Sequence, residues 1–285
     1  MLPALVEKTM YLLCSSLNAR ISNIESVYLY GSVALKDYIE GSSDIDFLAI
    51  VRNPLTQSDI QAIVAAHEEV EVVIPNTGIM GAYILFDDLE NKQNEISSLL
   101  TYYDKQINTN GLGADINPIT WWILKKHGIK IYGTDLTFNY DLEIASLLEY
   151  VISNLNSYWV NWINRLEKKL SFDNLSEQDI NVKQLDKAVE WCTLGMLRQL
   201  YTLKEHDITS KIGSGNYGIT ELPEKWNRLI HEAIAIKRLQ TNRYYKSQIQ
   251  RLTDLLAFLR FIHLEANHVY NNSIDSLNYR RTLTQ

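Results

Sequence analysis

The stretch that decides the fold is LYGSVALKDYIEGSSDIDFLAIV, residues 29–51. It runs from the end of one apolar segment through a Gly-Ser turn to two aspartates at the start of a second apolar segment. Because side chains alternate between the faces of a strand, Asp44 and Asp46 are expected to point the same way and Ile45 the opposite way. Two carboxylates this close repel each other unless a cation lies between them. The stretch therefore predicts two strands, a glycine turn and a cation site.

The residue types in this stretch suit a phosphate substrate as well as a cation. Magnesium prefers oxygen ligands and is commonly shared between one or two carboxylates and substrate phosphates. Gly31 lets a phosphate approach the backbone closely, and the Ser32 hydroxyl can donate a hydrogen bond to it. In the alternative interpretation, Gly31 merely ends a strand, and Asp44 and Asp46 are turn and cap residues. The two signals occur together, each beside its own strand, which favours the functional interpretation.

Length and composition exclude several classes of protein. The chain has 285 residues, enough for two domains or one large one, with 46% hydrophobic and 21% charged residues. A net charge of −7 argues against a nucleic-acid partner. No apolar run reaches the roughly 18 residues that would indicate a membrane-spanning helix, and the N-terminal segment is typical of an amphipathic helix rather than a signal peptide. The isolated Cys14 and Cys192 are expected to be buried, reduced residues of a cytoplasmic protein.

The first part of the chain alternates between helical and strand patterns, which predicts an α/β (α+β) domain with a small mixed sheet. Helices are expected at residues 3–20, 56–68 and 118–127, a mostly helical segment at 87–104, and strands at residues 25–30, 44–51, 69–75, 81–86 and 129–133.

After about residue 135 the pattern becomes helical. Apolar spacings of three and four recur in four stretches, with breaks between them that include residues 213–224; the stretches are residues 141–171, 178–204, 223–240 and 242–271. We therefore expect an α/β domain at residues 1–137 and an all-α C-terminal helical bundle at residues 138–285.

The Gly-Ser turn followed by Asp-x-Asp resembles the signature of the nucleotidyltransferase superfamily. Within that superfamily the chain is similar to the aminoglycoside adenylyltransferases that modify streptomycin and spectinomycin. The similarity is strongest at residues 28–51 and again in LGMLRQLYTLKEHDITSK, residues 194–211. It implies a nucleotidyltransferase that uses Mg²⁺ to transfer AMP from ATP to a hydroxyl of an aminoglycoside-like small molecule.

The resemblance also implies roles for individual residues. Asp44 and Asp46 would be the metal ligands, while Gly31, Ser32 and Ser43 would lie at the triphosphate. Two cations of the helical part, Arg198 and Lys211, would reach the nucleotide. Such donors stabilise the charge that develops on a leaving pyrophosphate.

The family has a third acid on the strand after the intervening helix, which acts as general base on the acceptor hydroxyl. Glu71, in EVEVVIP, resembles that acid if residues 69–75 form the strand beside Asp46. The alternative is that Glu69 and Glu71 form the solvent-exposed face of an edge strand. Glu190 and Trp121 are candidate contacts of the acceptor. The alternatives are a surface charge for Glu190 and packing between the two domains for Trp121.

Two other functions stay open at this stage. The chain could be a catalytically weak or inactive nucleotide-binding sensor, or a nucleotidyltransferase that acts on a protein target. The sequence does not fix the acceptor, the preferred nucleotide or the oligomeric state.

Overall fold

The computed structural model describes the chain apart from residues 90, 92–94, 114, 139–143, 172–174 and 284–285, and apart from the side chains of residues 273–283. The chain divides into two compact units, Met1–Leu142 and Glu143–Gln285, each of which is described by itself. The domain limits predicted from the sequence, 1–137 and 138–285, stay a prediction.

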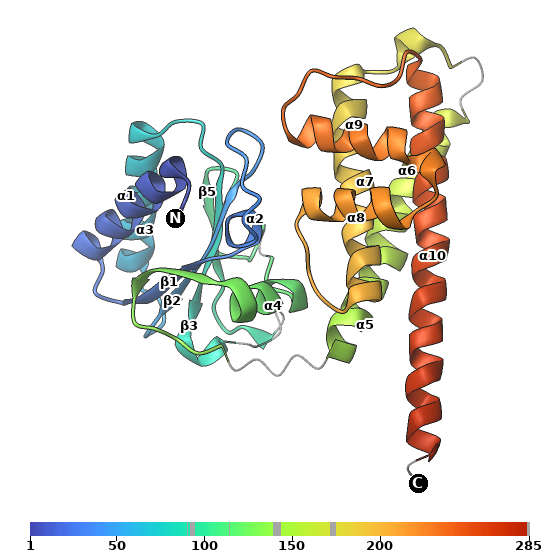
Figure 1. Cartoon of the computed structure of the whole chain (residues 1–285). Coiled ribbons are helices and arrows are strands. Elements are labelled where there is room, and N and C mark those ends of the chain that lie inside the picture. Colours follow the sequence, from blue (N-terminus) through green and yellow to red (C-terminus); the bar gives the residue numbers. More distant parts are fainter. Residues whose placement is uncertain (90, 92–94, 114, 139–143, 172–174, 284–285) are drawn as a thin grey trace. The chain divides into compact units, whose positions relative to one another are not determined.

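The first unit is a mixed sheet with helices on both faces (Figure 1). Within the described residues its sheet has six strands in the order β5-β4-β3-β2-β1-β6, of which β2 and β3 are parallel and the other neighbours antiparallel. The elements are α1 (Ala4–Arg20), β1 (Ile24–Leu29), α2 (Gly31–Ala34), β2 (Ile45–Val51), α3 (Gln57–Val73), β3 (Ile79–Leu85), η1 (Phe86–Asp88), β4 (Leu100–Tyr103), β5 (Gln106–Asn108), α4 (Pro118–His127) and β6 (Ile129–Gly133). This confirms the predicted α/β unit with a mixed sheet.

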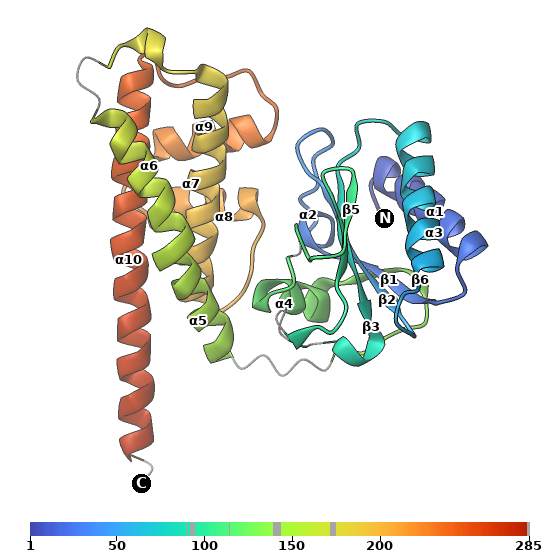
Figure 2. The ribbon, with the colours of Figure 1, turned by 180° about the vertical axis from the view of Figure 1, so that it is seen from behind.

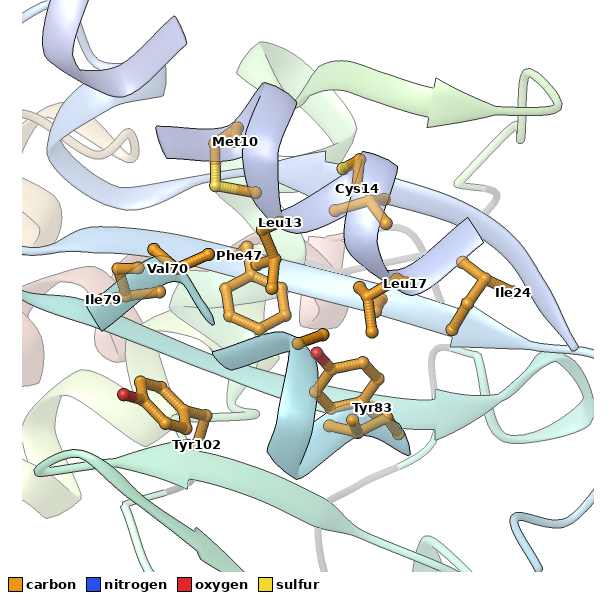
Figure 3. Close-up of a cluster of buried hydrophobic side chains, with 14 of the residues drawn as sticks. Met10, Leu13, Cys14, Leu17, Ile24, Phe47, Val70, Ile79, Tyr83 and Tyr102 are labelled. Atoms are coloured by element: carbon orange, nitrogen blue, oxygen red, sulfur yellow. The ribbon is translucent and has the colours of Figure 1, made fainter. Parts of the chain in front are cut away.

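The main core of this unit lies between the sheet and the pair α1 and α3 (Figure 3). Alternate residues of β2, Ile45, Phe47 and Ala49, are fully buried in it. Helix α4 lies on the opposite side of the sheet (Figures 1 and 2). Asp46, between two core residues on β2, therefore points away from the main core.

Two predictions in this unit are wrong. Residues 69–73, expected in a strand, are the last turns of α3, because the helical period continues: Ile63, Ala66 and Val70 are all fully buried. The strand next to β2 is instead β3, which begins after Gly78. The segment 87–104, expected to be mostly helical, contains the short turn η1 and the strand β4, while its residues 90 and 92–94 lie outside the described residues.

The second unit is helical, as predicted. Its elements are α5 (Ile144–Asn154), η3 (Leu155–Trp159), α6 (Val160–Leu170), η4 (Glu177–Asp179), α7 (Val182–Glu205), α8 (Lys211–Glu221), η5 (Glu224–Trp226), α9 (Asn227–Lys237) and α10 (Gln248–Leu283). The turn η3 is a π-helical segment between α5 and α6. Figure 2 shows α5 and α6 running beside α10.

The glycine-rich segment 213–224, expected to be a break, is mostly helix α8. A Cβ added at Gly215 would lie 2.8 Å from the Ile234 side chain, and one at Gly218 would lie 2.9 Å from Leu197. The glycines thus let the backbone of α8 approach α7 and α9 closely, and this packing outweighs their poor helix propensity.

The two cysteines, Cys14 in α1 and Cys192 in α7, are buried free thiols. Burial raises the pKa of Cys14 to about 12. Among the helices described, none combines the length and apolarity needed to span a bilayer.

Candidate functional site

The residues singled out in the Gly-Ser and Asp-x-Asp stretch lie at one edge of the sheet, where three neighbouring strands begin or end. Strand β1 ends beside Phe47, the third residue of β2, and the next residue, Tyr30, donates its backbone N–H to the Asp46 carbonyl at 3.1 Å. Strand β3 begins level with β2, with Ile79 paired to Ile45. Gly31, Asp46 and Gly78 are therefore brought to the same edge.

Each aspartate carboxylate lies directly against a glycine. A Cβ at Gly31 would lie 1.8 Å from Asp46 Oδ2, and a Cβ at Gly78 would lie 2.1 Å from Asp44 Oδ1. Gly31 also has a φ of +57°, a conformation that favours glycine. At both positions a side chain would have to displace a carboxylate, so the two glycines keep room for Asp44 and Asp46 at this edge.

The two serines predicted at the phosphates differ in their surroundings. Ser32 Oγ is buried and has no hydrogen-bond partner among the described residues. A buried hydroxyl without a partner is costly, and a ligand oxygen would satisfy it. Ser43 Oγ accepts a hydrogen bond from the Ile39 backbone N–H at 3.2 Å and so helps to order the loop before β2.

Burial and the nearby acids raise the pKa of two tyrosines next to the aspartates. Burial, with the Asp46 charge as the next cause, holds the pKa of Tyr30 well above its usual value. Burial also raises the pKa of Tyr38, with Glu40 and Asp44 as further causes. A cation would offset the negative charge of Asp44 and Asp46 at this edge.

Asp44 also lines a cavity of about 370 Å³ that lies between the end of α3, the loop before β3 and the β4–β5 turn. Glu71 lines the same cavity, although it comes from a helix and not from the predicted strand. Its carboxylate accepts a hydrogen bond from Tyr102 Oη at 3.1 Å and forms an ion pair with Lys105. The expectation that Glu71 shares a strand face with Asp44 and Asp46 is wrong, and β3 itself carries no acid.

A second layer of contacts supports the hydrogen bond between Tyr102 and Glu71. The His67 ring stacks on Tyr102, with ring centroids 3.7 Å apart, and hydrogen-bonds to Tyr83 Oη at 2.9 Å. Burial lowers the pKa of His67 to about 3, so the ring is neutral at physiological pH. The sequence pattern did not predict Gly78 and Lys105 as neighbours of the site, because the third strand was expected at residues 69–75.

In the second unit, Lys211 and Glu190 form an ion pair with an Nζ–Oε1 distance of 2.8 Å. Lys211 is the first residue of α8, and its Nζ lies 4.5 Å from the centre of the Trp191 ring. Arg198, half-buried, lies two turns beyond Glu190 on α7. The structure thus brings Lys211 and Glu190 together, while their contacts with a nucleotide or an acceptor stay predictions.

Trp121 does not fit its tentative role as an acceptor contact. Its side chain is 1% exposed, and its Nε1 donates to the Asn91 carbonyl at 3.3 Å. The neighbouring Trp122 is the one that is partly exposed, with Lys126 Nζ 4.1 Å from its ring centre. Adjacent residues of a helix point in different directions, and here Trp121 takes the core position.

Comparison with known proteins agrees with this arrangement. The nucleotidyltransferase domain family matches residues 14–101, and the family of the aminoglycoside adenylyltransferase C-terminal domain matches residues 173–260. No curated protein gives a significant match.

Two solved structures are similar to the chain. The spectinomycin adenyltransferase AAD(9) from Enterococcus faecialis, solved with ATP and spectinomycin, has a TM-score of 0.57 at 14% identity and covers 88% of this chain and 99% of its own. The STING-associated CdnE c-di-GMP synthase from Capnocytophaga granulosa has a TM-score of 0.25 at 12% identity and covers 94% of this chain and 80% of its own. The first likeness shows the fold.

The first unit therefore carries a nucleotidyltransferase domain, and the chain is an enzyme of this class. With the matching C-terminal domain, it is an aminoglycoside-adenylyltransferase-like nucleotidyltransferase.

Proposed function

We propose that the protein transfers AMP from ATP to a hydroxyl group of an aminoglycoside-like small molecule, with Mg²⁺ as cofactor and pyrophosphate as leaving group. One observation carries the proposal: two carboxylates, Asp44 and Asp46, lie at the same sheet edge as the buried, unpartnered Ser32 hydroxyl, each against a glycine. This combination suits a cation and a phosphate together.

Asp44 and Asp46 are the residues proposed to hold the metal. In the part of the chain that the structure describes, no group of three or more His, Cys, Asp or Glu side chains is placed to hold an ion. Two carboxylates nevertheless fit Mg²⁺, which keeps several waters and shares itself with substrate phosphates. When bound, the ion would neutralise charge on the phosphate oxygens.

The nucleotide is proposed to lie with its phosphates beside Gly31 and Ser32. The Ser32 hydroxyl would donate to a phosphate oxygen, and Ser43 would hold the loop that precedes the aspartates. The matching C-terminal domain supports a role for Arg198 and Lys211 in stabilising the charge of the leaving pyrophosphate. Lys211 would then exchange its present partner, Glu190, for a phosphate oxygen.

Glu71 is proposed as the general base. It lines the same cavity as Asp44, and β3, the strand beside Asp46, offers no acid for this role. The acceptor hydroxyl would give its proton to the Glu71 carboxylate, and its oxygen would attack the α-phosphorus of ATP as pyrophosphate leaves. Tyr102 and Lys105 would orient the carboxylate. Glu190 remains a proposed contact of the acceptor.

The ion pair between Glu71 and Lys105 also favours a second candidate function. Because the Lys105 ammonium group occupies the carboxylate that would have to face the acceptor hydroxyl, the chain could bind MgATP with little or no transfer and act as a nucleotide sensor. Both functions use ATP, which supports a place in the cytoplasm, where the two buried thiols stay reduced.

The test is incubation of the full chain with α-labelled ATP, Mg²⁺ and, separately, spectinomycin, streptomycin and a lincosamide. We expect label on one of these acceptors, together with release of pyrophosphate, and neither product with Asp46→Asn. Binding of MgATP without any labelled product would contradict transfer to these acceptors and favour the sensor. Absence of MgATP binding would contradict both functions.

A further inference from the structure

The cavity beside Asp44 contains one positively charged side chain, Lys105, among the described residues that line it. The other charged residues of its wall are acids: Asp44, Glu71 and Asp104. The Lys105 ammonium group forms its ion pair with Glu71 Oε2. Lys105 is therefore the side chain of this wall that can offer positive charge to an anionic group of a substrate.

The ion pair between Lys105 and Glu71 lies partly in solvent. The Lys105 side chain is 56% exposed and the Glu71 side chain 20% exposed. An ion pair in such a setting contributes little net free energy, because each charge gives up hydration and side-chain freedom for the other. The exchange of Glu71 for another anion therefore costs Lys105 little.

The backbone at Lys105 belongs to a tight hairpin turn, so an exchange of partner is confined to the side chain. Tyr103 pairs with Gln106, which leaves Asp104 and Lys105 as the two turn residues between β4 and β5. Their φ angles are +50° and +61°, and the two-residue type I′ turn requires a positive φ at both positions. From this fixed point the lysine carries its ammonium group on a flexible four-carbon stem.

Glu71 keeps a second partner when Lys105 leaves. Tyr102 Oη donates to Glu71 Oε1 at 3.1 Å, whereas Lys105 pairs with Oε2. Tyr102 is 2% exposed and its ring stacks on His67, so the position of this donor is fixed. Departure of the ammonium group would thus free Oε2 while the carboxylate stays in place.

We propose that Lys105 is a phosphate-binding residue that exchanges between two partners. In the free protein its ammonium group pairs with Glu71 Oε2, and with MgATP bound it donates to a phosphate oxygen of the nucleotide. ATP carries more negative charge than one Mg²⁺ neutralises, and the remaining charge attracts the lysine. The exchange opens Oε2 to the acceptor hydroxyl when the nucleotide is present, and it transfers no proton. This inference rests on the ATP site of the proposed function and adds a residue to it.

The test is calorimetric titration of MgATP into the full chain and into variants at Lys105. Lys105→Met should bind MgATP at least about tenfold more weakly, because a hydrogen bond between two charged groups is lost. Lys105→Gly should show the same loss, and glycine favours the positive φ at this position, so this variant excludes a folding defect as the cause. Lys8→Met removes the same charge from an exposed position of α1 outside the cavity and should keep the affinity within about twofold.

A double variant distinguishes a contact with phosphate from simple neutralisation of Glu71. Lys105→Met with Glu71→Gln removes both charges of the pair, so the net charge of the cavity stays as in the parent protein. We expect this double variant to bind MgATP at least about tenfold more weakly than the parent. Equal affinity would show that Lys105 acts only by neutralising Glu71 and would overturn the proposal. Equal weakening by Lys105→Met and Lys8→Met would show a general charge effect and would also overturn it.

The outcome is separate from that of the transfer test. MgATP binding that depends on Lys105, without any labelled acceptor, would contradict AMP transfer to these acceptors and support the phosphate contact. Labelled acceptor together with unchanged MgATP affinity of Lys105→Met would support the transferase and overturn the role of Lys105. Failure of the parent protein to bind MgATP would contradict both proposals.

Discussion

Acidic side chains gather in both units of the molecule, and their surroundings differ. In the second unit Arg251 lies between Asp186 and Glu232, with an Nη2–Oδ1 distance of 2.6 Å to Asp186 and an ion pair to Glu232. Arg251 and Glu232 are almost completely buried, at 1% and 0% exposure of their side chains. In the first unit Asp44 and Asp46 lie against the backbone of Gly78 and Gly31.

The difference separates acids that hold the fold together from acids that suit a ligand. Asp186 and Glu232 join α7 and α9 to α10 through a guanidinium, and their charge is satisfied within the unit. Asp44 and Asp46 are placed where glycines leave space, and after burial their charges are a further cause of the raised pKa of the neighbouring Tyr30 and Tyr38. Substitutions in the first set should change stability, and substitutions in the second set should change activity.

The largest expected effect is that of Glu232→Gln. Removing the charge leaves Arg251 buried with an incomplete set of partners, which should lower the free energy of unfolding by about 3–5 kcal/mol. Denaturant unfolding measures this change, while AMP transfer per folded molecule should be unaltered. Glu167→Gln, which breaks an exposed pair with Arg260, is the control and should cost at most about 1 kcal/mol. Equal costs for the two variants would contradict a structural role for the buried cluster.

Asp46→Asn should show the reverse pattern. We expect AMP transfer to fall by about 10²–10³-fold, since a preorganised charge at the phosphates is lost, with the thermal midpoint nearly unchanged. Asp135→Asn, at the largely exposed end of the pair with Lys130, is the matched control and should keep full activity. A variant that lost stability and activity in parallel would place Asp46 with the structural acids.

Glu71 shares features with both sets of acids, because it has a cation partner yet lines the cavity of Asp44. Glu71→Gln is therefore the next informative variant. As a general base Glu71 should contribute about 10²-fold to the rate of transfer, the lower end of the usual range, because Lys105 holds the carboxylate. The control is Glu69→Gln on the same helix, where the carboxylate bonds Ser16 and Arg20. Unchanged transfer by Glu71→Gln would show that Glu71 is not the base.

The smallest expected effect is a pH dependence of stability from His67. Burial lowers the pKa of His67 to about 3, whereas the unfolded value is about 6.5, so the unfolded chain binds the proton first as the pH falls. The stabilisation is complete above pH 6.5 and is lost progressively below it, by about 2 kcal/mol at pH 5.

Unfolding measured from pH 7.5 to 5 tests this expectation. His67→Gln should flatten the slope more than His263→Gln, because the pKa of the half-buried His263 is lowered less. A slope that His67→Gln leaves unchanged would contradict a neutral, buried His67.

Much of the candidate site at the sheet edge could be predicted, because its residues lie close together in the sequence. Strands β1 and β2 are short apolar segments next to a glycine turn, so Gly31 and Asp46 followed from the chain alone. The strand predicted at residues 69–75 was wrong because the sequence of residues 69–73 fits two periods. Alternating Glu and Val fit a strand, and the buried Val70 also continues the apolar period of the helix. These residues are helical in the structure, even though the helix leaves Val72 82% exposed.

The parts that could not be predicted depend on residues brought together from distant elements. The contacts of Glu71 with Tyr102 and Lys105 join α3 to the β4–β5 hairpin, and nothing in the local sequence pairs them. The same holds for α8, whose glycines break a helix by propensity but allow it to pack against α7 and α9.

The proposed function depends on a magnesium ion that Asp44 and Asp46 hold and that binds ATP. Calorimetric titration of ATP into the full chain, with Mg²⁺ and then with a chelator, tests it most directly when repeated on Asp44→Asn. We expect the parent protein to bind ATP only with Mg²⁺, and we expect this binding to be lost in the folded variant. Equal affinity of the variant, or equal affinity of the parent in the chelator, would contradict it.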